Sequence, residues 1–470
     1  MHKWLPAALG YIPRWIEFQL RQSEQPGCVI AVADRGKLIL EQAFGHADLD
    51  HGTALTPRHR FRVASHSKSF TAAGIMKLRE KGRLQLDDEP GRYVDRLHPA
   101  VAKTTIAQLL SHSAGLVRDG TDAGQWQDRR PFLKASELRA DLAAAPVIAA
   151  NTRFKYSNHG FGLAGLIIEA ITGEPYRDWI KREIVDAVGL AETEPDMPIG
   201  ADVPMAHGHS GKWPIGRRLV VPGDNPTNAL AAATGFVSTA ADLARFFAQL
   251  DPAARRSALS TASRREMTRR QWRDVYSSIE RHYGLGIMGG KTADCEWFGH
   301  GGSFPGFISQ TAVLPQYGLT VSIVTNTSDR LANLWVDGVI HLIAAFARRG
   351  APDARVRGWT GRWWSRWDAV DLVPMGNRVL VANPALLNPV ADASELAISG
   401  ADQGHIALAT GLANHGEPVR RNRSANGTIE EVWLGGTRLV PEKKAIAELT
   451  GRHGEHRQPR PSARARRARA

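Results

Sequence analysis

Strand-like runs lie at both ends of the first 350 residues, and a long helical stretch separates them. The run GCVIAVADRGKLILEQAFG predicts two strands joined at Asp34-Arg35-Gly36, which is a hairpin signal. Residues 83 to 250 are typical of helix and loop, and short strand-like runs broken by Gly and Pro return after about residue 282. A helix over LWVDGVIHLIAAFARR closes this part. We therefore expect an α/β (α+β) fold, in which helices flank one antiparallel sheet and a helical insert interrupts its strand order.

Several helix boundaries carry recognisable signals. Apolar residues at helical spacing predict a helix over residues 13–23. Another helix is expected to begin at Ser65 and to end at Gly82, a residue type favoured just past a helix C-terminus. Two further helix starts are predicted by capping patterns, namely Thr105 with Gln108, and Thr239 or Ser238 ahead of Asp242.

The character of the sequence changes after residue 350. The segment APDARVRG fits a linker, and beyond it short strand-like runs alternate with turn dipeptides such as Asn426-Gly427 and Gly435-Gly436. We predict a main domain of residues 1–350, a small C-terminal all-β barrel or sandwich of residues 351–450, and a basic disordered tail of residues 451–470. We expect the tryptophan cluster of the small domain to fill its core rather than to stack on bases; its members are Trp359, Trp363, Trp364 and Trp367.

The net charge of +13 is concentrated at one end of the chain. The last 19 residues hold seven Arg and one Glu, a net +6, in a Pro/Ala/Arg context that cannot bury apolar area. We interpret this segment as a solvated tail rather than a nucleic-acid-binding element, because no folded basic motif accompanies it. A tail that did bind nucleic acid would lose its affinity steeply with salt.

Cysteine content and hydropathy suggest a compartment. Cys28 and Cys295 are too few for a disulfide framework and fit no zinc motif, so we expect buried thiols in strands. The N-terminal segment lacks a 7–15-residue apolar core, and no window approaches 18 apolar residues. We therefore expect no signal peptide, no membrane span and a cytoplasmic location.

Ser65 and Lys68 lie three residues apart at the start of a predicted helix, in FRVASHSKSF. Residues at this spacing lie on one helix face, and a serine needs a neighbouring base to act as a nucleophile. The helix N-terminus also favours developing negative charge on Ser65. Taken alone, the pair is weak evidence for catalysis, because serine is a common N-cap and lysine is a common helix residue, and the structural interpretation is favoured.

Two further stretches make a catalytic interpretation more specific. Tyr156 and Asn158 form a Tyr-x-Asn motif in NTRFKYSNHG, and His300 opens His-Gly-Gly-Ser in EWFGHGGSFPGF. These motifs, in this order, resemble the serine β-lactamase-like hydrolases, in particular the branch that holds class C β-lactamases, D,D-peptidases, D-aminopeptidases and β-lactamase-like esterases. Connecting segments such as LLSHSAGL and TGFVSTAADLARF also resemble the family over residues 25 to 348. The family's fold is an antiparallel sheet with a helical insert.

The resemblance implies roles for the motif residues. Ser65 would attack a carbonyl and become acylated, while Lys68 and Tyr156 would share the general-base work, with the tyrosine acting as a phenolate or through the lysine. Asn158 would orient Lys68 and the substrate's amide side. The strand at residues 300 to 303 would form the opposite wall of the site, where His300, Gly301 and Gly302 contact substrate. The backbone N–H groups of Ser65 and Ser303 would form the oxyanion hole.

Each of these residues also has a structural interpretation. Tyr156 would be a core tyrosine, Asn158 a turn residue and His300 a residue at a strand end, but the three together would require three coincidences. Lys291-Thr292-Ala293 is similar to the family's motif for the strand that forms the wall opposite the nucleophile, but it lacks that motif's glycine. We therefore assign this wall to His300 and not to Lys291.

The remaining histidines do not suggest a metal. His66, His112 and His159 are not joined by a ligand pattern, and we expect the Gly/Pro-rich loop that holds His207-Gly208-His209 to have no carboxylate nearby. We expect a substrate-facing or plain loop role for the latter pair, and no metal or other cofactor.

Within the resemblance, three features favour a D-aminopeptidase or D-amino-acid amidase. They are the histidine at position 300, where β-lactamases usually have lysine, the additional β domain and the expected cytoplasmic location. The substrate of such an enzyme would be a small molecule or short peptide. A carboxylesterase is the alternative, and a non-catalytic penicillin-binding-type sensor is the alternative of a different class. A homo-oligomer is compatible with the sequence.

Overall fold

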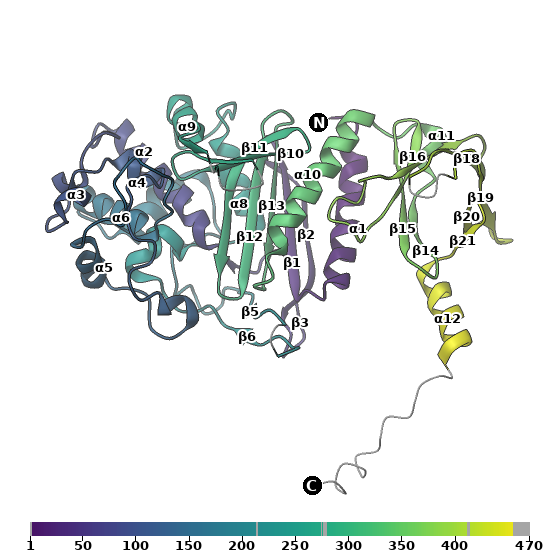
Figure 1. Ribbon diagram of the computed structural model, residues 1–470, viewed down its shortest axis with the longest axis horizontal. Coiled ribbons are helices and arrows are strands. Elements are labelled where there is room, and N and C mark those ends of the chain that lie inside the picture. The colour runs from purple at the N-terminus through teal and green to yellow at the C-terminus, as the bar shows by residue number, and fades with distance from the viewer. Residues whose placement is uncertain (1, 213–214, 274, 276–279, 411–413, 455–470) are drawn as a thin grey trace, which may run out of the picture. The chain divides into compact units, whose positions relative to one another are not determined.

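The computed structural model in Figure 1 describes residues 2–212, 215–273, 275, 280–410 and 414–454. The chain forms two compact units, residues 12–344 and residues 2–11 together with those from 345 onward. The domain boundaries at residues 350 and 450 remain a proposal. The predicted disordered tail lies outside the described residues from 455 onward, whereas residues 451–453 are helical.

The first unit is built on one antiparallel sheet. In the described residues, nine strands follow the order β3-β2-β1-β13-β12-β11-β10-β9-β8. Pairing of β1 with β13, with Cys28 opposite Thr325, brings the two ends of this region together. The strands are β1 (Gly27–Asp34), β2 (Lys37–Asp48), β3 (Thr53–Ala54), β8 (Trp272–Arg273), β9 (Arg281–Tyr283), β10 (Met288–Thr292), β11 (Cys295–Phe304), β12 (Phe307–Leu314) and β13 (Leu319–Thr325).

Local signals explain much of this sheet. The turn between β1 and β2 places Arg35 and Gly36 at φ values of 48° and 82°, which a two-residue hairpin turn of type I′ requires. The predicted hairpin is therefore confirmed. Cys28 in β1 and Cys295 in β11 are buried thiols that form no disulfide in the described chain, as expected.

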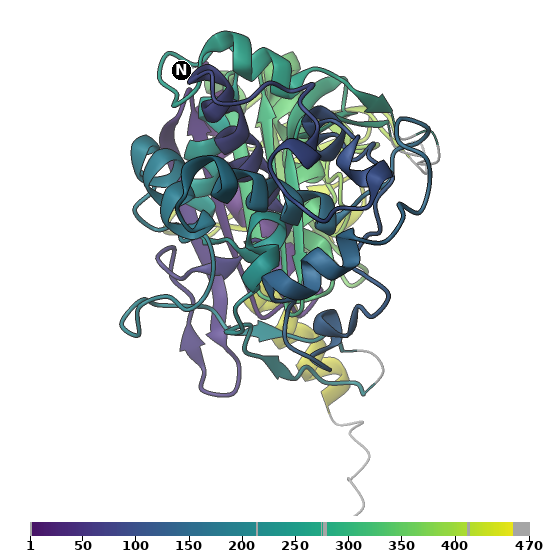
Figure 2. The same cartoon turned by 90° about the vertical axis from the view of Figure 1, so that its left-hand side faces the viewer.

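Helices and loops fill the interval between β4 (Phe61–Arg62) and β8, as predicted, and Figure 2 shows the helices in front of the sheet. The capping box of Thr105 and Gln108 is present, and the Thr239 side chain accepts a hydrogen bond from the Asp242 backbone N–H. The α-helices between residues 5 and 349 are α1 (Leu5–Gln22), α2 (Ser67–Glu80), α3 (Pro99–Ala102), α4 (Ile106–Leu110), α5 (Ala135–Leu142), α6 (Asn158–Thr172), α7 (Tyr176–Ile180), α8 (Ala240–Leu250), α9 (Thr261–Thr268) and α10 (Leu331–Arg349), as far as the structure describes this part of the chain. The antiparallel sheet with a helical insert is thus confirmed.

The prediction for α1 was wrong at its start. We placed the first helix at residue 13, but α1 begins at Leu5 and contains Pro13. The apolar spacing that predicted the helix was considered only from residue 13 onward, and packing of the apolar residues on both sides of Pro13 keeps the proline inside the helix. Trp15 and Ile16 are fully buried.

One helix of the described chain, α10, is long and apolar enough to cross a membrane by length and composition. Within its most apolar window, 61% is buried inside the structure, which is the pattern of a core helix. The helix is therefore not a clear membrane span.

The second unit has an eight-stranded antiparallel sheet in the order β14-β15-β16-β17-β18-β19-β20-β21, counted over the described residues. A bridge between Trp364 and Val440 joins its first strand to the residue after its last, so the sheet is nearly closed like a barrel. The elements are α11 (Ala354–Arg357), β14 (Gly361–Trp364), β15 (Ala369–Met375), β16 (Arg378–Ala382), β17 (Ser394–Ile398), β18 (Gln403–Leu408), β19 (Pro418–Arg423), β20 (Ile429–Leu434), β21 (Thr437–Leu439) and α12 (Glu442–His453).

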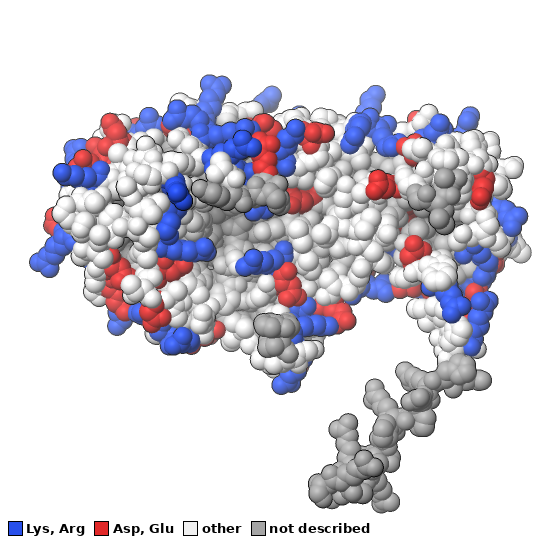
Figure 3. Space-filling model, viewed as in Figure 1, with Lys and Arg blue, Asp and Glu red and all other residues white. Residues whose placement is uncertain are grey.

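The tryptophans of this unit divide between its core and its surface. Trp359 and Trp363 belong to the hydrophobic core cluster, as predicted. Trp367 is 90% exposed, so its assignment to the core was wrong; it lies in the turn before β15, where Ser365 caps the backbone. The segment interpreted as a linker is partly helical, because α11 occupies Ala354–Arg357. Figure 3 shows both signs of charge spread over the visible face rather than a single basic patch.

Candidate active site

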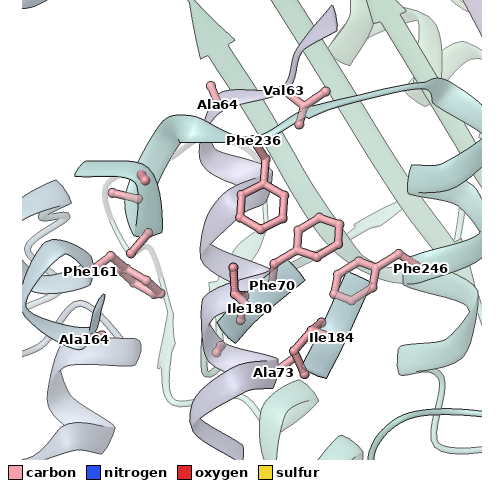
Figure 4. Packing of buried hydrophobic residues seen from close by; sticks show 14 of the residues in the cluster. Val63, Ala64, Phe70, Ala73, Phe161, Ala164, Ile180, Ile184, Phe236 and Phe246 are labelled. Carbon is pink, nitrogen blue, oxygen red and sulfur yellow. The ribbon is translucent and has the colours of Figure 1, made fainter. Parts of the chain in front are cut away.

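Ser65 lies in a short 3-10 turn, η1 (Ala64–His66), directly before α2. The preceding Ala64 has φ of 45°, in the left-handed region, which costs about 1–3 kcal/mol for a residue with a side chain. Packing holds this conformation: Figure 4 shows Phe70 of α2 between Phe236 and Phe246, and its ring centroid lies 4.3 and 3.8 Å from theirs. The sharp turn therefore fixes Ser65 at the start of a rigid helix.

Two side chains hydrogen-bond the Ser65 hydroxyl. Lys68 Nζ lies 3.2 Å from Ser65 Oγ, and Tyr156 OH lies 2.7 Å from it. The lysine comes from the first turn of α2, whereas the tyrosine comes from the segment that leads into α6. The structure thus brings together the alcohol, amine and phenol that the motifs selected.

The environment of Lys68 is that of a base. The side chain is fully buried, and burial lowers its pKa well below the usual 10.5. Its Nζ also donates to Asn158 Oδ1 at 2.7 Å and to the Ala233 carbonyl at 2.8 Å. When Lys68 is neutral, these two acceptors take its two N–H groups, and its lone pair is left facing Ser65 Oγ.

Tyr156 has the opposite character. Burial raises its pKa above that of a free phenol, although the hydrogen bond to Ser65 and the nearby Arg118 oppose the shift. The tyrosine is therefore a protonated phenol near neutral pH, which favours a base acting through Lys68 over a tyrosinate. The ring packs on His112 with centroids 4.2 Å apart, and His112 Nδ1 accepts from the Ser157 backbone N–H.

Asn158 contacts Lys68 as expected. Its Oδ1 accepts from Lys68, and its Nδ2 donates to Asp119 Oδ1 at 2.6 Å. The side chain is buried, with 4% of the residue exposed. Both ends of the amide thus have a partner within the protein, and the contact with a substrate amide stays a prediction.

Strand β11 passes close to the nucleophile turn at Gly302. A Cβ on Gly302 would lie 2.1 Å from the Val63 carbonyl oxygen, so only glycine permits this approach. The glycine therefore allows the backbone of the nucleophile turn to lie directly against this strand. A cleft beside the strand is lined by Ser65, Tyr156, His300, Gly301, Gly302 and Ser303. Its lining also carries Arg118, Arg281, Arg330 and Asp337, so polar groups of a substrate have partners of both signs.

His300 lines this cleft, but its ring nitrogens are engaged within the protein. Nδ1 lies 2.7 Å from the Gly301 carbonyl, and Nε2 lies 2.8 Å from Tyr283 OH. Nδ1 must therefore carry the proton, and Nε2 accepts from the phenol. Burial lowers the pKa of His300 well below 6.5, so the ring is neutral.

Backbone donors for an oxyanion can be located from the strand register. Phe304 and Phe307 flank a two-residue turn between β11 and β12, and Ser303 faces Ile308 one step further along. Because hydrogen-bonded and non-hydrogen-bonded pairs alternate, the Ser303 N–H points away from β12. The Ser65 N–H lies in the first turn of a helical segment, where no intrahelical acceptor is available. Both residues line the cleft.

Other residues considered from sequence lie elsewhere. Lys291 is exposed and pairs with Asp294 at 3.3 Å. The expectation of no carboxylate near His207 was wrong, because Asp48 comes from β2 and lies 3.0 Å from His207 Nδ1. His209 Nδ1 lies 3.0 Å from the Asn326 carbonyl, which indicates a loop-fixing role. Within the described residues, no group of three His, Cys, Asp or Glu residues is arranged to hold a metal.

Sequence reasoning missed three residues around the cluster. Asp119 and His112 hold Asn158 and Tyr156, and the carbonyl of Ala233 accepts from Lys68. His112 lies within the family-like segment LLSHSAGL, and Asp119 lies three residues past the end of that segment, which was the available signal. A backbone carbonyl such as that of Ala233 leaves no trace in side-chain motifs.

In this structure a serine hydroxyl beside strand β11 is bonded by a lysine three residues further on and by a distant tyrosine. This arrangement defines the class of active-site-serine proteins with a Ser-x-x-Lys motif. Residues 13–337 match the sequence profile of the Beta-lactamase family. The chain belongs to the β-lactamase family.

Known relatives agree with this placement. Protein flp of Staphylococcus aureus (strain N315) is 28% identical over 186 residues, which are 39% of this chain and 37% of flp, so the match spans well under half of that relative. The octameric penicillin-binding protein homologue from Pyrococcus abyssi shares the fold, with a TM-score of 0.65 at 21% identity over 92% of this chain and 99% of that one. A D-stereospecific amidohydrolase from Streptomyces sp. is similar over 69% of this chain and 94% of that one, with a TM-score of 0.57 and 26% identity.

Proposed function

We propose that the chain is a serine hydrolase that acts through an acyl-enzyme on a small amide or ester, as a D-aminopeptidase or D-amino-acid amidase. The observation that carries the proposal is the hydroxyl of Ser65, held by Lys68 at 3.2 Å and by Tyr156 at 2.7 Å at a cleft. An activated alcohol beside an accessible strand is suited to acyl transfer.

The chemistry follows from the geometry. Lys68 takes the Ser65 proton through its lone pair, and Oγ attacks the substrate carbonyl while the N–H groups of Ser65 and Ser303 bind the oxyanion. Lys68 or Tyr156, both within reach of Oγ, returns a proton to the leaving group. Water then cleaves the acyl ester by the reverse sequence of proton transfers.

Two features support the D-amino-acid assignment. The Streptomyces protein, similar over 69% of this chain, is described as a D-stereospecific amidohydrolase. A neutral His300 stands where β-lactamases of the resembled branch usually have lysine. A neutral wall residue attracts a substrate carboxylate less than a lysine does.

We also propose a cytoplasmic, homo-oligomeric protein. The Pyrococcus abyssi homologue is described as octameric, and it covers 92% of this chain. Light scattering coupled to size-exclusion chromatography tests the assembly. We expect a mass of at least twice the 51.3 kDa of one chain, and a mass of 51.3 kDa would refute the oligomer.

Chromogenic substrates test the activity. We expect hydrolysis of D-alanine p-nitroanilide to exceed that of the L-enantiomer and of p-nitrophenyl butyrate, with no turnover by Ser65→Ala. Faster ester hydrolysis would favour the carboxylesterase. Acylation by labelled penicillin without turnover of any substrate would favour a sensor.

A further inference from the structure

Asp119 lies behind the cluster, in the loop that follows α4, and no motif selected it. Its carboxylate accepts three hydrogen bonds: from Asn158 Nδ2 at 2.6 Å, from Trp126 Nε1 at 3.0 Å and from Arg118 Nε at 3.2 Å. The first two share Oδ1. The carboxylate is therefore fixed in place by its own donors while it contacts Asn158.

An amide side chain has two ends of opposite character, and its neighbours decide which end points where. A carboxylate only accepts hydrogen bonds, so the end of Asn158 that faces Asp119 must be the NH₂ group. The oxygen of Asn158 then necessarily faces Lys68 Nζ, at 2.7 Å. Without Asp119, the amide could turn and present its NH₂ group to Lys68 instead.

The orientation of this amide matters for the base. With Asn158 Oδ1 and the Ala233 carbonyl as acceptors, the N–H groups of neutral Lys68 point at them, and its lone pair faces Ser65. A reversed amide would donate to the lone pair and compete with the Ser65 hydroxyl for it. Misplacing a reacting group by about 1 Å can cost about 100-fold in rate.

We propose that Asp119 is a positioning residue that acts through Asn158 to direct the lone pair of Lys68 at Ser65. The inference rests on the proposed serine hydrolase function. It assigns Asp119 a part in the acylation step without contact with the substrate.

The charge of Asp119 gives a readout that a purely structural role would not produce. Asp119 opposes the effect of burial on the pKa of Lys68, whereas Arg118 reinforces it. The ionisable groups that face Lys68 come from several elements; they are Asp119 and Arg118 in the loop, Tyr156 before α6, His112 after α4 and His300 on β11. Both histidines are held neutral by burial, so Asp119 and Arg118 carry the charge near this amine.

The test uses Asp119→Asn, Asp119→Leu and a matched control, Asp141→Asn. Asp141 bonds His159 Nε2 at 2.8 Å, so the control removes a carboxylate from the residue next to Asn158 on α6. The rate of Ser65 labelling by a fluorophosphonate is measured from pH 5 to pH 10 on the full chain, alongside the melting temperature.

We expect Asp119→Leu to label about 100-fold more slowly than wild type. In Asp119→Asn the new amide oxygen still accepts from Asn158, so labelling should be faster than in Asp119→Leu. Because a negative charge near Lys68 is lost, the acid limb of the pH–rate profile of Asp119→Asn should lie about one pH unit below that of wild type. Asp141→Asn should match wild type.

Three results would overturn the inference. Wild-type rates and pH midpoints in both Asp119 variants would remove the role. A lower melting temperature with unchanged labelling per folded molecule would make Asp119 merely structural. If Asp119→Leu does not fold, a wild-type pH midpoint in Asp119→Asn would by itself overturn the inference. A wild-type protein that is not labelled at all would instead refute the proposed function, and this inference with it.

Discussion

Gly302→Ala tests whether the cleft depends on the close approach of β11 to the nucleophile turn. The new Cβ would lie 2.1 Å from the Val63 carbonyl oxygen and 2.9 Å from the Val63 carbonyl carbon. Carbon and oxygen in favourable contact stay about 3.3 Å or more apart, so the strand and the turn must separate by roughly 1 Å. Backbone occupies both sides of this contact, and no rotamer change can relieve it.

Two losses follow from that separation. Overpacking of this kind costs about 1–3 kcal/mol of stability. The Ser303 N–H also moves away from Ser65 Oγ by a similar distance, and misplacement by about 1 Å costs about 100-fold in rate. We therefore expect a modest loss of stability and a large loss of acylation in the same variant.

The assay is fluorophosphonate labelling of Ser65, with thermal unfolding measured in parallel. Gly160→Ala is the control, because its Cβ would meet only atoms at 3.6 Å or more, which is ordinary contact, and the residue does not line the cleft. Labelling of Gly160→Ala should stay close to wild type. Equal effects of the two substitutions, or wild-type labelling in Gly302→Ala, would refute the steric reasoning.

Three other substitutions or conditions give separable outcomes. Tyr156→Phe keeps the ring but loses the hydroxyl that bonds Ser65, so acylation should fall by about 100-fold or more with the melting temperature little changed; an unchanged rate would remove the phenol from the reaction. The pH–rate profile of wild-type acylation should rise through the pKa of Lys68, which burial lowers, so that its acid limb lies well below pH 10.5; a limb centred at 10.5 would show an ordinary lysine. Thr239→Ala removes the cap of α8 and should cost about 1 kcal/mol in denaturant unfolding while labelling per folded molecule stays constant; a labelling defect would contradict the purely structural role.

Local patterns account for most of the fold that could be predicted. Turn chemistry at Arg35 and Gly36 and the cap at Thr239 depend on a few adjacent residues, and both were located correctly. The start of α1 was missed because apolar spacing was considered only from residue 13 onward, whereas the helix begins at Leu5 and continues through Pro13. Trp367 illustrates another limit, since an aromatic residue between strands does not reveal on its own which way it faces.

The site was predictable where side-chain identity carries the chemistry. The motifs located Ser65, Lys68 and Tyr156, which the structure brings together, although their catalytic roles remain proposals. Asp119 was not found, because its partner Asn158 lies 39 residues away and the contact exists only in the folded chain. His300 was placed on the correct strand, but its bond to Tyr283 depends on the pairing of neighbouring strands.

The central claim is that one alcohol in the chain, that of Ser65, is activated by its neighbours. Peptide mapping by mass spectrometry after brief fluorophosphonate treatment tests this directly, with wild type and Lys68→Arg compared side by side. The account predicts a single modified peptide containing Ser65 in wild type and at least about 100-fold slower modification in Lys68→Arg, whose guanidinium cannot act as a base. Modification of another serine, or equal rates in the two proteins, would contradict it.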